Sequence, residues 1–203
     1  MIIRDCIQGD ENWLAERAGK VSASNFSKIF TASGSKTTGE TRKSYLYQIA
    51  GERISKAPEE SFKNDWMQRG NDLEPEARFA FEQITGLFVA QTGMVLLDDR
   101  EEISCSPDGL IGDQSGLELK CPKMSTHIGY LEAARLPSTY KPQVMGQLWI
   151  CDRPQWHFMS YHPSIKPFHL IVERDQKYIS LLQEAVEEFN AEVNSLVSRI
   201  KED

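Results

Sequence analysis

The segment SCSPDGLIGDQSGLELKC, residues 104–121, places three charged side chains in stretches that otherwise have the composition of buried strands. Two apolar runs flank a turn at residues 112–116, so the pattern predicts a hairpin. Because side chains alternate between the two faces of a strand, Glu118 and Lys120 are expected on one face, and the core face is expected to carry Leu117, Leu119 and Cys121. The hairpin would bring Asp108 alongside, so that two carboxylates and an ammonium group share a small site.

An ordinary surface ion pair between Glu118 and Lys120 would explain a bare E-x-K pattern. The preceding Pro107-Asp108-Gly109 favours a functional site, because Pro107 and Gly109 restrict the backbone around Asp108 and permit a sharp bend. A carboxylate fixed in this way suits a hard cation such as Mg²⁺. The three charged residues therefore indicate a metal-dependent site.

Hydrolysis of a phosphodiester requires neutralised phosphoryl oxygens, a deprotonated water and a stabilised leaving oxygen, all of which one or two metal ions can supply. We predict that Asp108 and Glu118 hold the metal, with the main-chain carbonyl of Leu119 as a further ligand. Lys120 would orient or activate the nucleophile and stabilise the developing negative charge. The sequence thus predicts a nuclease-type active site.

The rest of the chain alternates between helical and strand patterns. Helices are expected at about residues 13–18, 24–30, 42–55, 65–85, 124–136, 141–151 and 175–200. Strands are expected at 89–97, 103–111, 117–121, 156–161 and 168–173, the first three as a meander. Pro75 predicts a start or a kink in the helix near Glu74, and Pro163 and Pro167 separate the last two strands. We expect a mixed α/β core in one domain, residues 1–203.

Composition excludes several classes of protein. The 203 residues are 40% hydrophobic and 26% charged, and no apolar run approaches the roughly 18 residues of a membrane span. We expect no membrane association and, since no basic segment precedes a long apolar stretch at the N-terminus, a cytoplasmic location. The four cysteines and four histidines show neither C-x-x-C nor H-E-x-x-H spacing, so a zinc centre is not expected.

The net charge of −7 argues against a protein that coats nucleic acid, because phosphate binding depends on Lys and Arg. The charge is unevenly distributed. Between residues 12 and 56, eight Lys and Arg residues stand against three Glu, a local balance of +5. A basic N-terminal region on an acidic body suits DNA held in one groove.

At this point the sequence resembles the phage lambda exonuclease family of recombination nucleases, within the PD-(D/E)xK superfamily. Residues 106–109 and 116–122 match the core motif without a departure at the catalytic positions. Further matching blocks follow the family's order and comprise Trp13 with Arg17 and residues 22–24, Arg69-Gly70 with Glu74, Tyr140 with Gln143, and residues 172–175. The resemblance covers most of the chain and is specific in combination.

The resemblance implies a restriction-endonuclease-like core, with a central mixed β-sheet flanked by helices. It also implies that Glu74 is an additional carboxylate near the metals, although an exposed glutamate near a helix end is the ordinary explanation from the residues alone. A pocket for the terminal 5′-phosphate is implied at Arg17, Ser24, Ser106 and Gln143. A guanidinium fork, two hydroxyls and an amide suit phosphate oxygens. Capping, packing and solvation explain their neighbours equally well, namely Ser22, Gln147 and Lys20.

By the same resemblance we expect a 5′→3′ exonuclease that degrades one strand of linear double-stranded DNA from 5′-phosphorylated ends and leaves 3′ single strands for recombination. It implies two Mg²⁺ ions per active site, replaceable by Mn²⁺, a ring-shaped homotrimer around DNA, and a single-strand annealing protein as partner. Two alternatives stay open: a structure- or sequence-specific endonuclease on the same fold, and a non-catalytic DNA-end-binding module.

Overall fold

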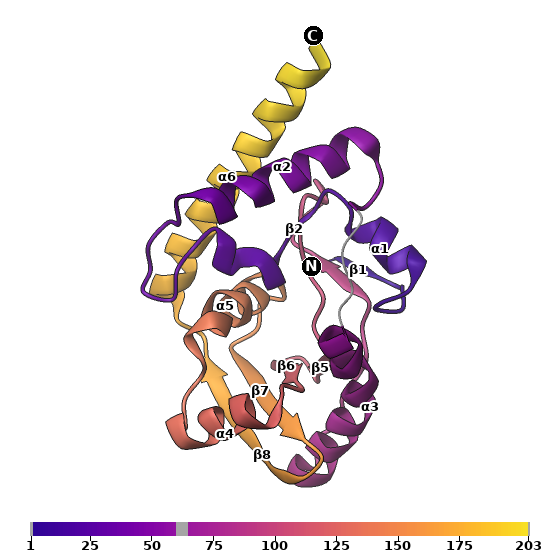
Figure 1. The fold of residues 1–203 in the computed structure, drawn as a ribbon, viewed down its shortest axis with the longest axis vertical. Coiled ribbons are helices and arrows are strands. Elements are labelled where there is room, and N and C mark those ends of the chain that lie inside the picture. Colours follow the sequence, from indigo (N-terminus) through magenta and orange to yellow (C-terminus); the bar gives the residue numbers. More distant parts are fainter. Residues whose placement is uncertain (1, 60–64, 203) are drawn as a thin grey trace.

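The computed structural model describes residues 2–59 and 65–202, and these form two four-stranded sheets with helices around them (Figure 1). The first sheet has the order β1-β3-β4-β2 and consists of β1 (Ile2–Arg4), β3 (Met94–Leu96), β4 (Ile103–Cys105) and β2 (Val21–Ser22). The second has the order β5-β6-β7-β8 and consists of β5 (Gly109–Ile111), β6 (Ser115–Lys120), β7 (Gln155–His162) and β8 (Ile165–Glu173).

Six α-helices and two 3₁₀ segments lie within the described ranges. They are α1 (Glu11–Arg17), η1 (Ala23–Lys28), α2 (Glu40–Ser55), α3 (Asp65–Thr85), α4 (Met124–Ala133), η2 (Ser138–Tyr140), α5 (Lys141–Ile150) and α6 (Gln176–Glu202). The seven expected helices are all present, although the second is a 3₁₀ segment. Helix α3 spans Asp65–Thr85 without a break at Pro75.

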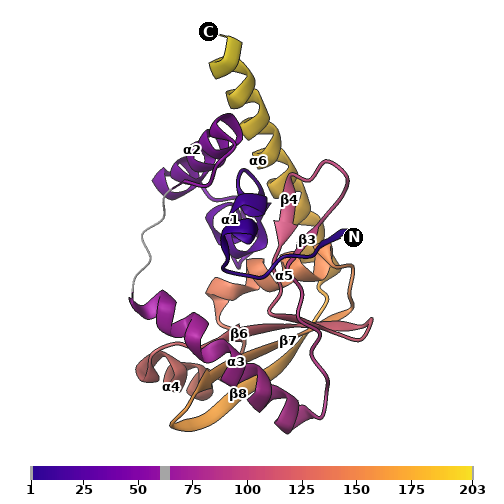
Figure 2. The same ribbon diagram turned by 90° about the vertical axis from the view of Figure 1, so that its right-hand side faces the viewer.

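The second sheet is mixed, because β6 runs parallel to β7 whereas β5–β6 and β7–β8 are antiparallel pairs. Helix α3 crosses one face (Figure 2), where Ala77 and Phe81 pack with Leu117 and Leu119. Helix α5 lies on the other face, toward which Glu118 points. The predicted architecture, a mixed sheet flanked by helices, is therefore confirmed, and both faces of β6 are covered.

The prediction of one strand at residues 103–111 is wrong, and so is the meander built on it. Residues 103–105 belong to the first sheet and residues 109–111 to the second. The chain changes sheets at Ser106-Pro107-Asp108, where Pro107 has no N–H to continue a ladder. Directly after this segment, a Cβ on Gly109 would lie 2.1 Å from Val89 Cγ1. The close approach of these two segments of the chain therefore requires glycine at position 109.

Two short N-terminal strands were not predicted. Strand β2 runs parallel to β4 and pairs Ser22 with Ser104, which brings the N-terminal region beside the Asp108 turn. At the other end of the fold, Pro167 lies inside β8 and does not separate it from β7. An edge strand tolerates proline, and the β7–β8 register shifts between Ser160 and His162, close to it.

Helix α6 confirms the helix expected at residues 175–200, and its apolar side chains repeat every three or four residues. Its core-facing side chains are Tyr178, Ile179, Leu182, Ala185, Val186, Phe189 and Val193. They pack against α2 and α5, and the C-terminal end extends beyond α2 (Figure 1). Across residues 2–59 and 65–202, no helix combines the length and the apolar character needed to cross a membrane.

Candidate active site

The Asp108 turn is held by hydrogen bonds on both sides. Gln8 Nε2 donates to the carbonyl of Pro107 at 2.6 Å, and the Asp108 N–H donates to the carbonyl of Leu117 at 3.1 Å. The Asp108 carboxylate in turn accepts a hydrogen bond from the N–H of Leu119. The carboxylate is thus fixed against β6, as the predicted hairpin required.

Glu118 and Lys120 share one face of β6, as predicted, and form an ion pair. Glu118 is buried, and both of its carboxylate oxygens accept amide hydrogen bonds from α5. Gln143 Nε2 donates to Oε1 at 2.7 Å and Gln147 Nε2 donates to Oε2 at 2.6 Å. Lys120 is partly exposed, and its Nζ lies 5.2 Å from the centre of the Tyr140 ring. A buried carboxylate therefore meets a cation whose other side is covered by an aromatic face.

The pKa values of Asp108 and Lys120 are shifted by burial and by the neighbouring charges. Burial raises the pKa of Asp108 well above its usual range, the Glu118 charge raises it further, and Lys120 opposes both. Burial lowers the pKa of Lys120, but the charges of Glu118 and Asp108 outweigh burial and leave it raised. Lys120 is therefore held as an ammonium ion, a form that stabilises negative charge.

Glu74 contributes to the same field, because its charge also raises the pKa of Asp108. Its carboxylate is engaged by Arg78 Nη2 at 2.7 Å, one turn along α3. Within the two described stretches, no three side chains of the His, Cys, Asp and Glu types are close enough to hold a metal by themselves. Nevertheless, the charges of Glu118 and Glu74 repel that of Asp108, and a hard divalent cation held among these oxygen donors would relieve the repulsion.

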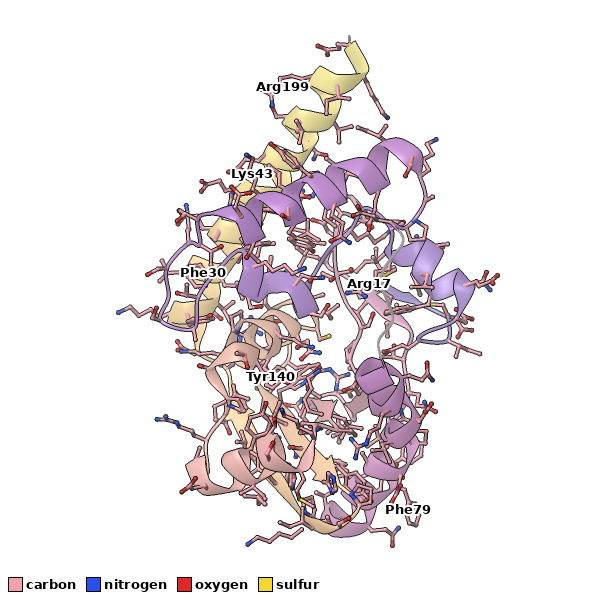
Figure 3. The ribbon with its side chains drawn as sticks, in the orientation of Figure 1. Arg17, Phe30, Lys43, Phe79, Tyr140 and Arg199 are labelled. Atoms are coloured by element: carbon pink, nitrogen blue, oxygen red, sulfur yellow. The ribbon has the colours of Figure 1, made fainter. Side chains whose placement is uncertain are left out.

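A second cluster forms around Arg17, which extends from α1 toward the middle of the molecule (Figure 3). Its Nη2 donates to Ser22 Oγ at 3.0 Å and to Ser24 Oγ at 2.7 Å, and its guanidinium carbon lies 4.9 Å from the centre of the Trp13 ring. Burial lowers the pKa of Arg17. No carboxylate forms an ion pair with Arg17 within residues 2–59 and 65–202, so the cluster suits an anion.

Trp13 connects the two clusters. Its indole Nε1 donates to Ser106 Oγ at 3.1 Å, and Ser106 lies two residues before Asp108. The Arg17 cluster therefore adjoins the turn that carries the first catalytic candidate.

Comparison of the sequence with known protein families gives a match. The YqaJ-like viral recombinase domain matches residues 12–154, which is more than half of the chain. The chain belongs to the YqaJ-like viral recombinase family. The match runs from the residue before Trp13 past α5, so it includes both clusters.

Similar proteins support the same family assignment. The crystal structure of the alkaline exonuclease LHK-Exo from Laribacter hongkongensis superposes with a TM-score of 0.87 at 30% identity, over 95% of this chain and 97% of that one. A phage-related exonuclease from Haemophilus somnus 129PT shares the fold, with a TM-score of 0.71 at 20% identity over 89% and 96% of the two chains. ExoD, an uncharacterised protein of Escherichia coli K12, is 29% identical over 80 residues, 38% of this chain and 90% of ExoD.

The family and the similarity to LHK-Exo confirm the lambda-exonuclease-like resemblance and the restriction-endonuclease-like fold, and they support a nuclease that acts on DNA. Most residues predicted for the site lie in the two clusters. The first cluster contains Asp108, Glu118, Leu119 and Lys120, with Glu74 nearby; the second contains Arg17 and Ser24, with Ser106 joined to it through Trp13. Gln143, predicted with the phosphate pocket, donates to Glu118 instead of to the Arg17 cluster.

Gln147 was not assigned a function from the sequence, although a signal was present. It is a polar residue in the run Val144-Met145-Gly146-Gln147-Leu148-Trp149-Ile150, four residues after Gln143. On a helix, residues four apart lie on the same face. The contact of Tyr140 with Lys120 had no such signal, because it depends on how η2 packs against β6.

Proposed function

We propose that the chain is a single-domain, Mg²⁺-dependent 5′→3′ exonuclease that degrades one strand of linear double-stranded DNA from 5′-phosphorylated ends. The observation that carries this proposal is the hydrogen bond from Trp13 to Ser106, which joins the Arg17 cluster to the Asp108 turn. A group that holds a terminal phosphate beside a hydrolytic site suits an enzyme that begins at ends. An endonuclease has no use for such a pocket.

Arg17 would bind the 5′-phosphate, with Ser24 and Ser106 donating from either side. Arg17 Nη2 already donates to both Ser22 and Ser24 at the start of η1, and this pair of hydrogen bonds fixes the guanidinium plane. The remaining donors of the fork are then pre-oriented for phosphate oxygens, and less side-chain entropy is lost on binding. Gln143 would complete this pocket only by turning its amide from Glu118 toward the phosphate.

Asp108 and Glu118 would hold the metal, with the Leu119 carbonyl and Glu74 as further ligands, the latter after release from Arg78. One or two Mg²⁺ ions, or Mn²⁺ in their place, neutralise phosphoryl charge and acidify a water when bound. Lys120 would orient the nucleophile and stabilise charge on the phosphoryl oxygens. The Tyr140 ring and the Glu118 carboxylate restrict the ammonium group to this position.

The family supports a proposal for the product and for the biological role. LHK-Exo has been crystallised in complex with dAMP, a 5′-mononucleotide of the kind that stepwise digestion from a 5′-phosphate end releases. We expect the remaining 3′ single strand to serve recombination through a single-strand annealing protein. A ring-shaped homotrimer would reconcile the net charge of −7 with DNA binding, because only its channel must be basic.

Two substitutions test the proposed site. Asp108→Ala and Lys120→Ala should abolish hydrolysis of end-labelled duplex while DNA binding, measured by gel shift with Ca²⁺ in place of Mg²⁺, persists. Undiminished hydrolysis in both variants would refute the site. Loss of hydrolysis together with rapid nicking of closed circles by the wild type would instead favour an endonuclease on this fold, and a wild type that binds ends without cleaving any substrate would identify a binding module.

A further inference from the structure

Gln147 is a buried polar residue in the apolar interior of α5. Its side chain is 1% exposed, and residues 144–150 around it are all buried. Packing alone would favour leucine or methionine at this position, because a buried amide costs free energy unless its polar atoms are paired. The presence of glutamine therefore requires an explanation in terms of its contacts.

The contact is with Glu118. Gln147 Nε2 donates to Glu118 Oε2 at 2.6 Å, while Gln143 Nε2 donates to Oε1 at 2.7 Å from one turn earlier on the same helix. Each carboxylate oxygen thus has its own amide donor, and the plane of the carboxylate is fixed. Hydrogen bonds to an ionised acceptor are the short, strong type.

The orientation of the Gln147 amide is determined by this contact. Its Oε1 is buried and accepts no hydrogen bond from any residue in the described ranges 2–59 and 65–202. The Gln147 amide is therefore oriented by the hydrogen bond from its nitrogen to Glu118, although its oxygen is left without a partner.

Helix α5 holds the amide in place because the helix cannot shift easily. A Cβ on Gly146 would lie 2.5 Å from the Phe26 ring, so α5 and η1 are in direct backbone-to-ring contact at this point. The residue next to Gln147 is thus packed without free space. A donor on such a rigid element can position a catalytic group with little freedom.

We propose that Gln147 is a positioning residue that holds the Glu118 carboxylate in the orientation in which it takes a divalent cation. The inference rests on the proposed function, because it requires Glu118 to be a metal ligand. Groups that hydrogen-bond a metal ligand typically change metal affinity or activity by about 10- to 100-fold when they are removed.

The test measures Mn²⁺ binding to the protein without DNA by isothermal titration calorimetry, together with the melting temperature and kcat and KM on duplex ends. Gln147→Met preserves volume and removes the donor, whereas Gln147→Asn keeps an amide that is too short to reach Glu118. Leu148→Met is the matched control, since it places methionine at the neighbouring buried position, which belongs to the apolar core and offers no hydrogen-bond donor to Glu118. Both Gln147 variants should weaken Mn²⁺ binding and lower kcat about 10- to 100-fold with KM for DNA ends little changed, whereas the control should match the wild type.

The outcomes separate the two proposals. If a Gln147 variant that melts cooperatively binds Mn²⁺ and turns over as the wild type does, or loses only melting temperature, the positioning role is wrong. Gln147→Asn decides the question if Gln147→Met does not fold. If Glu118→Ala retains wild-type Mn²⁺ affinity, the proposed metal site itself fails. If Glu118→Ala loses affinity while both Gln147 variants keep it, only the inference about Gln147 fails.

Discussion

Replacement of Arg17 by glutamine should remove the preference for phosphorylated ends. A guanidinium carries five N–H donors, and Nη2 uses both of its own on Ser22 and Ser24. The other three have no acceptor in the described part of the chain, and two of them match the oxygens of a terminal phosphate. At about 1.5 kcal/mol for each charge-assisted hydrogen bond, the lower end of the usual range, the pair contributes about 3 kcal/mol, or about 100-fold.

The assay compares initial rates on two blunt linear duplexes that differ only in a 5′-phosphate or a 5′-hydroxyl. The wild type should prefer the phosphate by about 100-fold, and Arg17→Gln should cut both at similar rates. Arg17→Lys keeps the charge but loses the fork, so an intermediate preference of about tenfold is expected. A preference that survives in Arg17→Gln, or an equal loss on both ends, would show that Arg17 does not bind the phosphate.

Two further properties can be measured without DNA. Gly146→Ala should lower the free energy of unfolding by about 1–3 kcal/mol, because its Cβ would lie 2.5 Å from the Phe26 ring. Gly51→Ala on α2 is the control and should be neutral or stabilising, because no atom lies within 4 Å of the added Cβ. Equal melting temperatures of the two variants would contradict this prediction. Burial lowers the pKa of His157 to about 4, and the charge of His169 adds to the effect. As the pH falls from 6.5 toward 4, the imidazole is therefore protonated in the unfolded chain but stays neutral in the folded chain. Stability should therefore fall over that window and less steeply in His157→Gln, as chemical denaturation at several pH values would show; identical slopes would exclude His157 as a contributor.

The sequence was sufficient for the elements whose pattern is local. The three-to-four-residue apolar repeat of α6 predicts which of its side chains are buried, and the alternation around Glu118 predicts the face of β6 on which each side chain lies. The structure agrees with both, although Glu118 is itself buried. The family motifs added the sheet architecture, which local patterns do not specify.

The sequence failed where the fold depends on partners distant in the chain. Residues 103–111 have a continuous strand pattern, yet the chain changes sheets at Pro107 because β4 pairs with β2 and β3 while β5 pairs with β6. Gly109 was expected to permit a bend, whereas the structure shows that it makes room for Val89. The donation of Gln143 and Gln147 to Glu118 likewise depends on how α5 lies over β6. The roles of the individual site residues stay predictions.

The central claim, metal-dependent digestion that begins at 5′-phosphate ends, is tested most directly with one pair of substrates. A linear duplex labelled at its 5′-phosphate end and a covalently closed circle of the same sequence are incubated with the protein, with and without Mg²⁺. We predict early release of the labelled mononucleotide from the linear duplex only when Mg²⁺ is present, with the circle intact. Cleavage of the relaxed circle, loss of the 5′ label only at late times, or hydrolysis without a divalent cation would contradict the account.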